Sequence, residues 1–500
     1  MPEDNITVQA FAGSLKYVIP AAAVGVLFLI AYLSGRRQGD TTDFFLGGRK
    51  VPGVVACLSF VATEVSAATI TAVPATAYTE NWQYLQYFVG SAIARVLVAL
   101  LFIPAFYRCE CTTVYQFLRN RFGSATQYCG SGFFLVGRLL GSGVRLYAAA
   151  GAVAVLMGLD LRLAILLFTL VGIVFIGFGG VKAVAWTGAF EALVFFSVGF
   201  VLLGFIYSRI SGPIGPWLWG GGHDPLKLWN LTFNFSDDGT LPGALLNGLF
   251  VGLAVFGTDQ ELMQRLLAVR TRRASQQALL TTIVAVLPLA VCYLGIGTLL
   301  YVFYRQNPGL APGPGESKQV LSIFAVGVMP LAMQGLLLAG IVMASIDSPL
   351  ASLSSSFVTD LYRPLIRKSA GERHYLMVAR LGVAGFGLVL GCIAWLCRDA
   401  KNILWLAFQV FSITGGSLLG VFLLGLLTRV RSNRANVAAM IISSLTTLSL
   451  LLLSREDLFV PGKLLNLGWD WLIVIGTLLT MALSVLLSRV LDKPAGTPQP

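Results

Sequence analysis

The sequence predicts an all-α integral membrane protein. Of its 500 residues, 56% are hydrophobic and only 12% are charged, and the mean hydropathy is +0.79. Apolar runs of about 20 residues recur along the chain, which is the length of a membrane-spanning helix and about twice that of a barrel strand. This composition excludes a soluble globular protein.

Hydropathy predicts thirteen membrane spans, the longer of which must tilt or extend beyond the bilayer. They cover residues 17–33, 54–79, 83–106, 127–157, 162–181, 183–209, 243–266, 277–304, 322–359, 375–397, 401–427, 433–454 and 468–491. The first ten residues, MPEDNITVQA, lack the basic region of a signal peptide, so we expect no cleaved leader.

Basic residues indicate how the chain sits in the membrane. An odd number of spans places the termini on opposite sides. The 35 Lys and Arg residues favour the loops on one side by about two to one. We therefore expect an outside N-terminus and a cytoplasmic C-terminus in the plasma (inner) membrane. The net charge of +12 then reflects topology and predicts no nucleic-acid partner.

Four arginines lie within predicted spans and away from their ends, namely Arg95, Arg138, Arg145 and Arg380. The seven cysteines are interpreted as structural. Cys109 and Cys111 have no nearby histidine and are too few for a zinc site.

The stretch from Leu338 to Arg363 carries hydroxyls at helical spacing, including Ser345, Ser348 and Ser352. Such a stripe is either a helix–helix contact or a wall of oxygen ligands for a hard cation. Asp347 favours the second interpretation, because a carboxylate near mid-membrane costs roughly 2.5–3.5 kcal/mol and therefore indicates a function.

Two spans have the composition of helices that break within the membrane. Residues 60–78 combine Glu64 with small and β-branched residues and Pro74. Residues 247–265 carry glycines at 248, 252 and 257, followed by Asp259 and Glu261. Paired interrupted spans indicate a transporter binding site built on inverted repeats, although the glycines also suit close helix packing.

Three ordered motifs resemble the sodium/solute symporter family, whose members include sodium-coupled galactose, proline, pantothenate and sialic acid carriers. They are E-V-S-A-x-T-x-x-x-x-P-x-x-A-Y at 64–78, T-D-Q-x-x-x-Q-R-x-L-A at 258–268 and T-D-L-Y at 359–362. The similarity extends from about Asp43 to Arg434.

The resemblance implies a LeuT-like transporter core of 5+5 helices in inverted repeats. The implied parts are a leading helix with its loop (1–53), a first repeat (54–209), an extracellular loop (210–242), a second repeat (243–427) and two trailing helices with a short tail (428–500). The thirteen predicted spans and the outside N-terminus agree with it.

The resemblance also implies a sodium site between core helices 1 and 8. By position, its ligands are the carbonyls of Ala62, Val65 and Ile341 and the side chains at 344 and 345. Most members have two hydroxyls at that pair, whereas this chain has Ala344 and Ser345. Either Glu64 or Asp347 is placed to replace the missing ligand or to carry a proton. Glu64 is alternatively a gate, or a partner of Arg138 or Arg145.

Members with a second sodium site carry an Asp after a Trp-Thr pair on helix 5. Here Trp186 and Thr187 are followed by Gly188. One hypothesis is that Asp347, with Ser345 and Ser348, holds the cation from the opposite wall. The alternative is that Asp347 pairs with an arginine such as Arg138, with Gly188 easing helix packing.

For the solute, the resemblance points to helices 1, 2, 3 and 6. The matching residues are Thr69, Phe88, Ser91, Gly252 and, at the aromatic gate, Val255 or Phe256. Two polar groups that a sugar needs are absent. Arg138 and Arg145, seven residues apart on helix 3, suit a carboxylate. Alternatively they form salt bridges with Glu64, Asp259 or Glu191.

The predicted function is secondary active transport, in which sodium drives uptake of a small, carboxylated organic solute by alternating access. Alternatives are proton coupling, an amino acid or sugar as solute, and, remotely, a transporter-like sensor. An enzyme is not expected. Na⁺, the solute and the lipid bilayer are the expected partners. A monomer suffices for this function, and the oligomeric state is left open.

Overall fold

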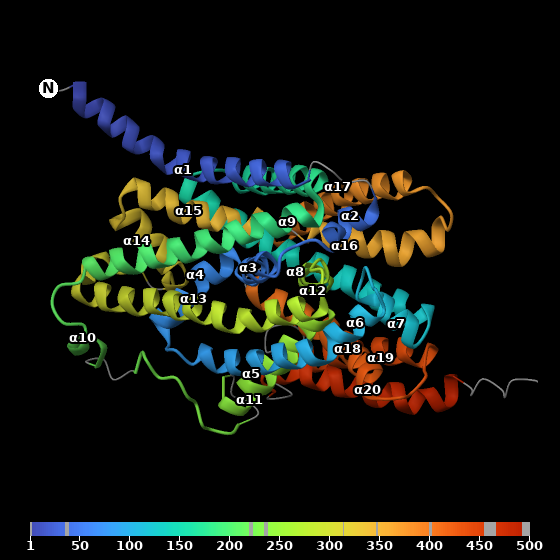
Figure 1. Cartoon of the computed structure of the whole chain (residues 1–500). Coiled ribbons are helices and arrows are strands. Elements are labelled where there is room, and N and C mark those ends of the chain that lie inside the picture. The colour runs from blue at the N-terminus through green and yellow to red at the C-terminus, as the bar shows by residue number, and fades with distance from the viewer. Residues whose placement is uncertain are drawn as a thin grey trace, which may run out of the picture.

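The computed structural model describes residues 3–35, 40–219, 224–234, 239–313, 315–346, 349–399, 403–454 and 467–492. Within these residues, helices run mostly along one direction in an elongated bundle (Figure 1). Nine helices there are long and apolar enough to cross a membrane, and the bent pair α3 and α4 makes a tenth candidate. The predicted all-α membrane fold is confirmed.

In the first half of the chain, the helices alternate between long spans and short connecting segments. They are α1 (Glu3–Gly35), α2 (Thr41–Leu46), η1 (Gly47–Arg49), α3 (Gly53–Glu64), α4 (Ala67–Thr79), α5 (Tyr84–Leu97), η2 (Val98–Phe102), α6 (Ile103–Arg108), α7 (Tyr115–Arg121), α8 (Ser124–Met157), α9 (Leu161–Ser208) and α10 (Gly215–Trp219).

The second half repeats this alternation. Its helices are α11 (Leu241–Leu253), η3 (Ala254–Thr258), α12 (Gln260–Leu267), α13 (Arg272–Gln306), η4 (Pro308–Leu310), η5 (Ser317–Gln319), α14 (Val320–Val328), α15 (Leu331–Ile346), α16 (Leu350–Ser356), η6 (Phe357–Ile366), α17 (Glu372–Leu396), η7 (Cys397–Asp399), α18 (Ile403–Leu427), α19 (Arg434–Leu453), η8 (Trp469–Trp471) and α20 (Leu472–Leu491).

The first predicted break lies between α3 and α4, which are bent by 58°. Helix α3 ends at Glu64, and Val65 is extended (φ −85°, ψ 120°). Ser66 then caps α4 with a capping box. Its Oγ accepts from the Thr69 amide at 3.3 Å, while its own amide donates to Thr69 Oγ1 at 3.2 Å.

The second predicted break lies between η3 and α12. Asp259 is extended (φ −81°, ψ 122°), and its Oδ1 accepts from the Glu261 amide at 2.8 Å, which caps α12. Both interrupted helices are therefore present, and in each a polar side chain satisfies an amide that the break exposes.

The glycines of the second interrupted span allow close helix packing. A Cβ at Gly248 would lie 2.2 Å from the carbonyl oxygen of Tyr87 on α5. A Cβ at Gly90, on the facing surface of α5, would lie 2.2 Å from the carbonyl oxygen of Leu245. Helices α5 and α11 can therefore cross only where both surfaces lack side chains.

The predicted spans 162–181 and 183–209 form the two parts of α9, which is interrupted at Gly180 (φ 58°, ψ −170°), near the predicted boundary. Another predicted boundary differs from the structure. The predicted span 322–359 begins too early, because Met329 is extended (φ −79°, ψ 142°) and separates α14 from α15. Pro330 explains this difference, since a proline disfavours helical geometry at the preceding residue.

Candidate solute and cation site

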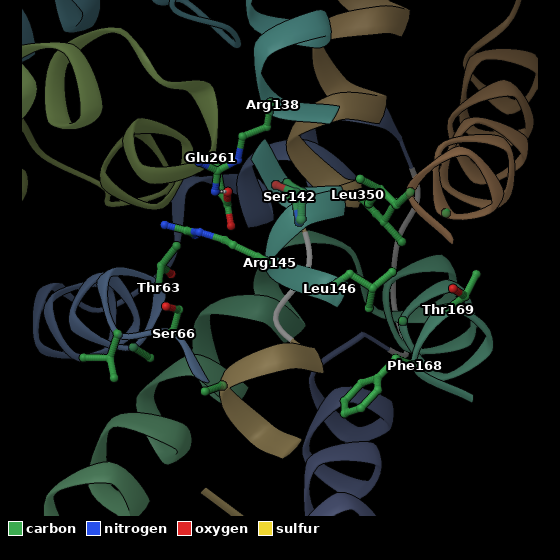
Figure 2. Close-up of a pocket in the computed structure, with 17 residues that line it drawn as sticks. Thr63, Ser66, Arg138, Ser142, Arg145, Leu146, Phe168, Thr169, Glu261 and Leu350 are labelled. Atoms are coloured by element: carbon green, nitrogen blue, oxygen red, sulfur yellow. Dashed lines mark ion pairs between the residues drawn. The ribbon is translucent and has the colours of Figure 1, made fainter. Parts of the chain in front are cut away.

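A cavity lies beside the first break, and residues distant in sequence form its wall. From the break come Ala62, Thr63, Val65 and Ser66, and from α8 come Arg138, Ser142, Arg145 and Leu146. Phe168, Thr169 and Gly172 of α9, Glu261 of α12, Ala344, Pro349 and Leu350 of the α15–α16 region, and Gly387 and Leu390 of α17 complete it. Figure 2 shows most of these side chains around the cavity.

Arg138 is held by two carboxylates at the second break. Its Nη1 lies 3.1 Å from Asp259 Oδ2, and its Nη2 forms an ion pair with Glu261. The three side chains are only 12%, 6% and 5% exposed, respectively. This cluster fastens α8 to the start of α12, and it matches the salt-bridge interpretation for Arg138, with Asp259 as one partner.

Arg145 has different surroundings. It lies seven residues further along α8, and it is an exposed residue that lines the cavity. Figure 2 shows its guanidinium group pointing from α8 towards the side of the cavity where Thr63 and Ser66 lie. An exposed guanidinium in the middle of a membrane helix is stable where the surface it reaches is a water-filled cavity.

Three residues predicted to contact the solute, Phe88 and Ser91 of α5 and Phe256 of η3, surround Arg95. This arginine is fully buried, its Nη1 donates to Ser91 Oγ at 2.7 Å, and it forms an ion pair with Glu64. Its guanidinium carbon lies 4.3 Å from the ring centre of Phe256 and 5.7 Å from that of Phe88. The partner of Glu64 is thus Arg95, which is neither of the two arginines considered from the sequence.

Two further residues that were predicted to contact the solute contact other parts of the protein instead. The Thr69 hydroxyl is part of the Ser66 capping box. Gly252 is buried, and a Cβ there would lie 2.6 Å from Cβ of Ala94. The hydroxyl groups lining the cavity are instead those of Thr63, Ser66, Ser142 and Thr169.

The first break supplies the backbone oxygens expected of a cation site. In a continuous helix the Ser66 amide would bond the carbonyl of Ala62, but here it donates to Thr69. The Ala62 carbonyl is thereby released from the helical pattern. Ala62, Val65 and Ala344 line the same cavity, and Ile341 is buried on α15. Carbonyl oxygens are suitable ligands for a hard cation.

The remaining proposed cation ligands are only partly described. Ser345 lies in the last turn of α15, but its side chain is outside the described part of the structure. Asp347 and Ser348 lie wholly outside the described residues. The structure therefore brings Ala62, Val65 and Ala344 together. The carboxylate of Asp347 and the hydroxyl of Ser348 lie outside the residues that it describes.

The later serines of the polar stripe make contacts within the protein. The hydroxyl of Ser352 donates to Pro349 O at 2.8 Å, and that of Ser355 donates to Ser352 O at 3.1 Å and accepts from Gln260 Nε2 on α12 at 3.5 Å. Ser356 Oγ donates to Asp360 at 3.0 Å and lies 2.8 Å from Ser131 Oγ on α8. This part of the stripe joins helices, as the packing interpretation predicts.

Gly188 packs tightly against α3. A Cβ at this position would lie 2.5 Å from Ser59 Oγ and 3.1 Å from Ser59 Cα. The Ser59 hydroxyl also accepts a hydrogen bond from Arg265. An aspartate at 188 would therefore require α3 and α9 to separate, which supports a packing role for this glycine.

The site includes residues that sequence reasoning missed. Arg95 was identified inside a span, but its pairing with Glu64 joins residues 31 positions apart on different helices. The Ser66 cap could have been found, because Ser-x-x-Thr at the predicted break resembles a capping box. Thr63 and Ser142 carry no such signal.

Comparisons with known proteins identify the family that the chain matches. A profile of the sodium:solute symporter family matches residues 44–443. The chain is 27% identical to the sodium/sialic acid symporter SiaT of Proteus mirabilis (strain HI4320), over 89% of this chain and 90% of that protein. It is 29% identical to a putative sodium-dependent multivitamin transporter of Drosophila melanogaster, over 85% and 72% respectively.

Solved structures show the same fold. A sodium-coupled sialic acid symporter, determined in a substrate-bound outward-open state with a novel sodium site, superposes with a TM-score of 0.86 at 25% identity. The match covers 95% of this chain and 98% of that one. Mhp1, a nucleobase-cation-symport-1 family transporter, matches with a TM-score of 0.57 at 15% identity and supports the fold alone.

Proposed function

The chain belongs to the sodium:solute symporter family, and from this premise we propose that its solute carries a carboxylate that Arg145 binds. The protein is a multi-pass membrane transporter that couples the movement of a small solute to sodium, and it is not an enzyme. The observation that carries the proposal is an exposed arginine at the cavity beside the first break.

The contrast between the two arginines of α8 supports this assignment. Arg138 already contacts Asp259 and Glu261, so a solute would have to displace a buried carboxylate from it. Arg145 also interacts electrostatically with Asp259, but it is exposed and faces the cavity, where Thr63, Ser66 and Ser142 supply hydroxyls. A guanidinium group binds a carboxylate through two parallel hydrogen bonds, and surrounding hydroxyls can bind the rest of a small polar solute.

The proposed position of sodium favours coupling between the cation and the solute. Ala62, Val65 and Ala344 line the cavity that Arg145 also lines. We propose that sodium binds the carbonyls of Ala62, Val65 and Ile341 with the hydroxyl of Ser345. Asp347 and Ser348 are proposed as further ligands. Sodium and a carboxylate in one cavity attract each other, so each favours binding of the other.

A sugar is disfavoured by the surroundings of Arg95. Ser91 and Phe88, at positions that match the sugar site of galactose carriers, and Phe256, at the aromatic gate position, contact this arginine. Arg95 of α5 forms an ion pair with Glu64 of α3, so its charge is already neutralised. We therefore place the solute against α8. A proton-coupled mechanism is the second candidate, but Glu64 would have to leave Arg95 before it could carry a proton.

The topology completes the proposal. The start of α1 and the end of α20 lie at opposite ends of the bundle (Figure 1). Together with the bias of basic residues, this supports an outside N-terminus and a cytoplasmic C-terminus in the plasma membrane. The breaks after Glu64 and before Gln260 fall in the second and seventh predicted spans. This spacing supports two five-helix repeats, 54–209 and 243–427.

Uptake into proteoliposomes tests the proposal. Radiolabelled organic acids and their matched carboxamides are compared under an inward sodium gradient and under potassium. We expect uptake of an acid but not of its amide, and only with sodium. Arg145→Gln should reduce this uptake at least tenfold, because a bidentate charged contact is lost.

The matched control is Arg380→Gln, which removes an exposed arginine of α17 that does not line the cavity. This variant should transport at the wild-type rate. Equal uptake of acid and amide, or wild-type affinity in Arg145→Gln, would show that Arg145 does not bind the solute. Uptake that follows a proton gradient and ignores sodium would favour the second candidate.

A further inference from the structure

The turn after α6 brings two cysteines together. The amide of Glu110 donates to Tyr107 O and the amide of Cys111 donates to Phe106 O, each at 3.3 Å. Glu110 is left-handed, with φ 50°. This is the Schellman arrangement that ends many helices, but with glutamate where glycine is usual. Cys109 and Cys111 lie on either side of the left-handed residue.

The two thiols have different surroundings. Cys111 is buried, whereas Cys109 is partly exposed. Asn120 Nδ2 donates a hydrogen bond to the sulfur of Cys109 at 3.4 Å, and the Cys111 thiol, two residues along the chain, interacts with the same sulfur. Both contacts favour a thiolate at Cys109. They lower the pKa of the Cys109 thiol to about 6, whereas donation to Cys109 raises the pKa of Cys111.

We propose that Cys109 and Cys111 form a peroxide-sensitive thiol pair. The Cys109 thiolate attacks one oxygen of a hydroperoxide, the O–O bond breaks, and a sulfenic acid forms as hydroxide or alkoxide leaves. The Cys111 thiol then attacks the sulfenic sulfur, which forms the disulfide and releases water. The pair loses two electrons to the peroxide, and a thiol reductant restores it.

The physical basis is the combination of a partly exposed nucleophile with an adjacent resolving thiol. A reactive cysteine needs thiolate character and access, and it is protected from further oxidation when a second thiol lies beside it. Cys109 accepts a hydrogen bond from Asn120 and is partly exposed, and Cys111 is the neighbouring thiol across the left-handed residue. This inference does not depend on the identity of the transported solute.

The pair adjoins a segment that contacts two core helices. The Val114 amide donates to Gln260 Oε1 on α12 at 2.9 Å, and Thr113 Oγ1 donates to Asp360 Oδ1 in η6 at 2.6 Å. Arg49 Nη2 donates to the carbonyl of Cys111 at 3.0 Å. A disulfide would thus form at the point where this connecting segment leaves α6.

The test uses the purified full chain, hydrogen peroxide as oxidant and dimedone as a trap for sulfenic acid. In the wild type we expect the peptide with Cys109 and Cys111 to lose two hydrogens, reversibly on reduction. In Cys111→Ser, dimedone should label Cys109, and in Cys109→Ser neither product should form. Absence of the disulfide in the wild type, or of the adduct on Cys109 in Cys111→Ser, would overturn the proposal.

A second measurement needs no variant. Alkylation of Cys109 by iodoacetamide is followed by mass spectrometry from pH 5 to 9, as working limits, with glutathione as an ordinary thiol in the same tube. Because the pKa is lowered to about 6, the rate for Cys109 should fall only as the pH drops through that value. Glutathione, as an ordinary thiol, should already lose reactivity at a pH well above the pKa of Cys109. Identical profiles for the two thiols would overturn the proposal.

Discussion

The two broken helices carry acidic residues at opposite helix ends. Glu64 is the last residue of α3, where the carbonyl end of the helix dipole already carries negative charge. Asp259 caps the start of α12, where the dipole is positive and favours a carboxylate. The Glu64 carboxylate is stabilised by Arg95 from a neighbouring helix. The Asp259 carboxylate is stabilised both by the N-terminus of its own helix and by Arg138.

This difference explains why the two breaks suit different tasks. At the second break, two buried acids share Arg138, and Asp259 also accepts from the Glu261 amide at the start of α12, so both acids are engaged in contacts within the protein. At the first break, carbonyl groups released by the bend face the cavity beside an acid with one arginine partner. The first break therefore favours a cation, and the second fastens α8 to α12.

The largest expected loss of stability comes from removing the ion pairs of Arg138 at the second break. Arg138→Gln leaves Asp259 and Glu261 buried without their cation, which should cost roughly 3–5 kcal/mol of stability. Thermal unfolding in detergent measures the loss. Adding Glu261→Gln should recover part of it, because one unpaired charge is removed. A double variant no more stable than Arg138→Gln would show that the loss has another cause.

A smaller effect is expected at the first break. Arg95→Gln removes the partner of Glu64, whose side chain is 24% exposed and retains some hydration. We expect a loss of about 2 kcal/mol, typical of a charged group that loses its hydrogen-bond partner. The same unfolding assay measures it, with exposed Arg380→Gln as control. A loss as large as that of Arg138→Gln would contradict the contrast between the two breaks.

The sequence predicted the breaks because they depend on local chemistry. Glu64 and Pro74 lie within an otherwise apolar span, and Asp259 follows three glycines. The early start of the predicted span 322–359 was wrong, although Pro330 gave a local signal that could have corrected it. Local composition and spacing thus predict where membrane helices begin and bend.

The side-chain partners could not be predicted in the same way. Glu64 was expected beside Arg138 or Arg145, but the structure pairs it with Arg95. The position of α5 beside the break decides this partner, and α5 is in turn packed against α11 through close contact at Gly90 and Gly248. Likewise, the different surroundings of Arg138 and Arg145 depend on the position of α12 beside α8. Spacing on one helix does not contain such information.

The smallest stability effect concerns the cap at the first break. Ser66→Ala removes the oxygen that accepts from the Thr69 amide and should cost about 1 kcal/mol. Ser66→Asn should keep most of the cap. Ser197→Ala is a suitable control, because Ser197 is an exposed residue within α9 whose hydroxyl bonds only its own helix. A loss for Ser66→Ala no greater than for Ser197→Ala would show that the cap contributes nothing.

The most direct test of the account measures sodium binding without a solute. Thermal unfolding of the purified protein is followed as sodium replaces potassium at constant ionic strength. A cation that binds at the first break of the folded protein should raise the midpoint temperature of unfolding in a saturable way. The Ser345→Ala variant should require at least severalfold more sodium for the same rise. Arg138→Gln should lower the midpoint without changing this sodium dependence. Equal stabilisation by potassium, or an unchanged sodium dependence in Ser345→Ala, would contradict a sodium site at the first break.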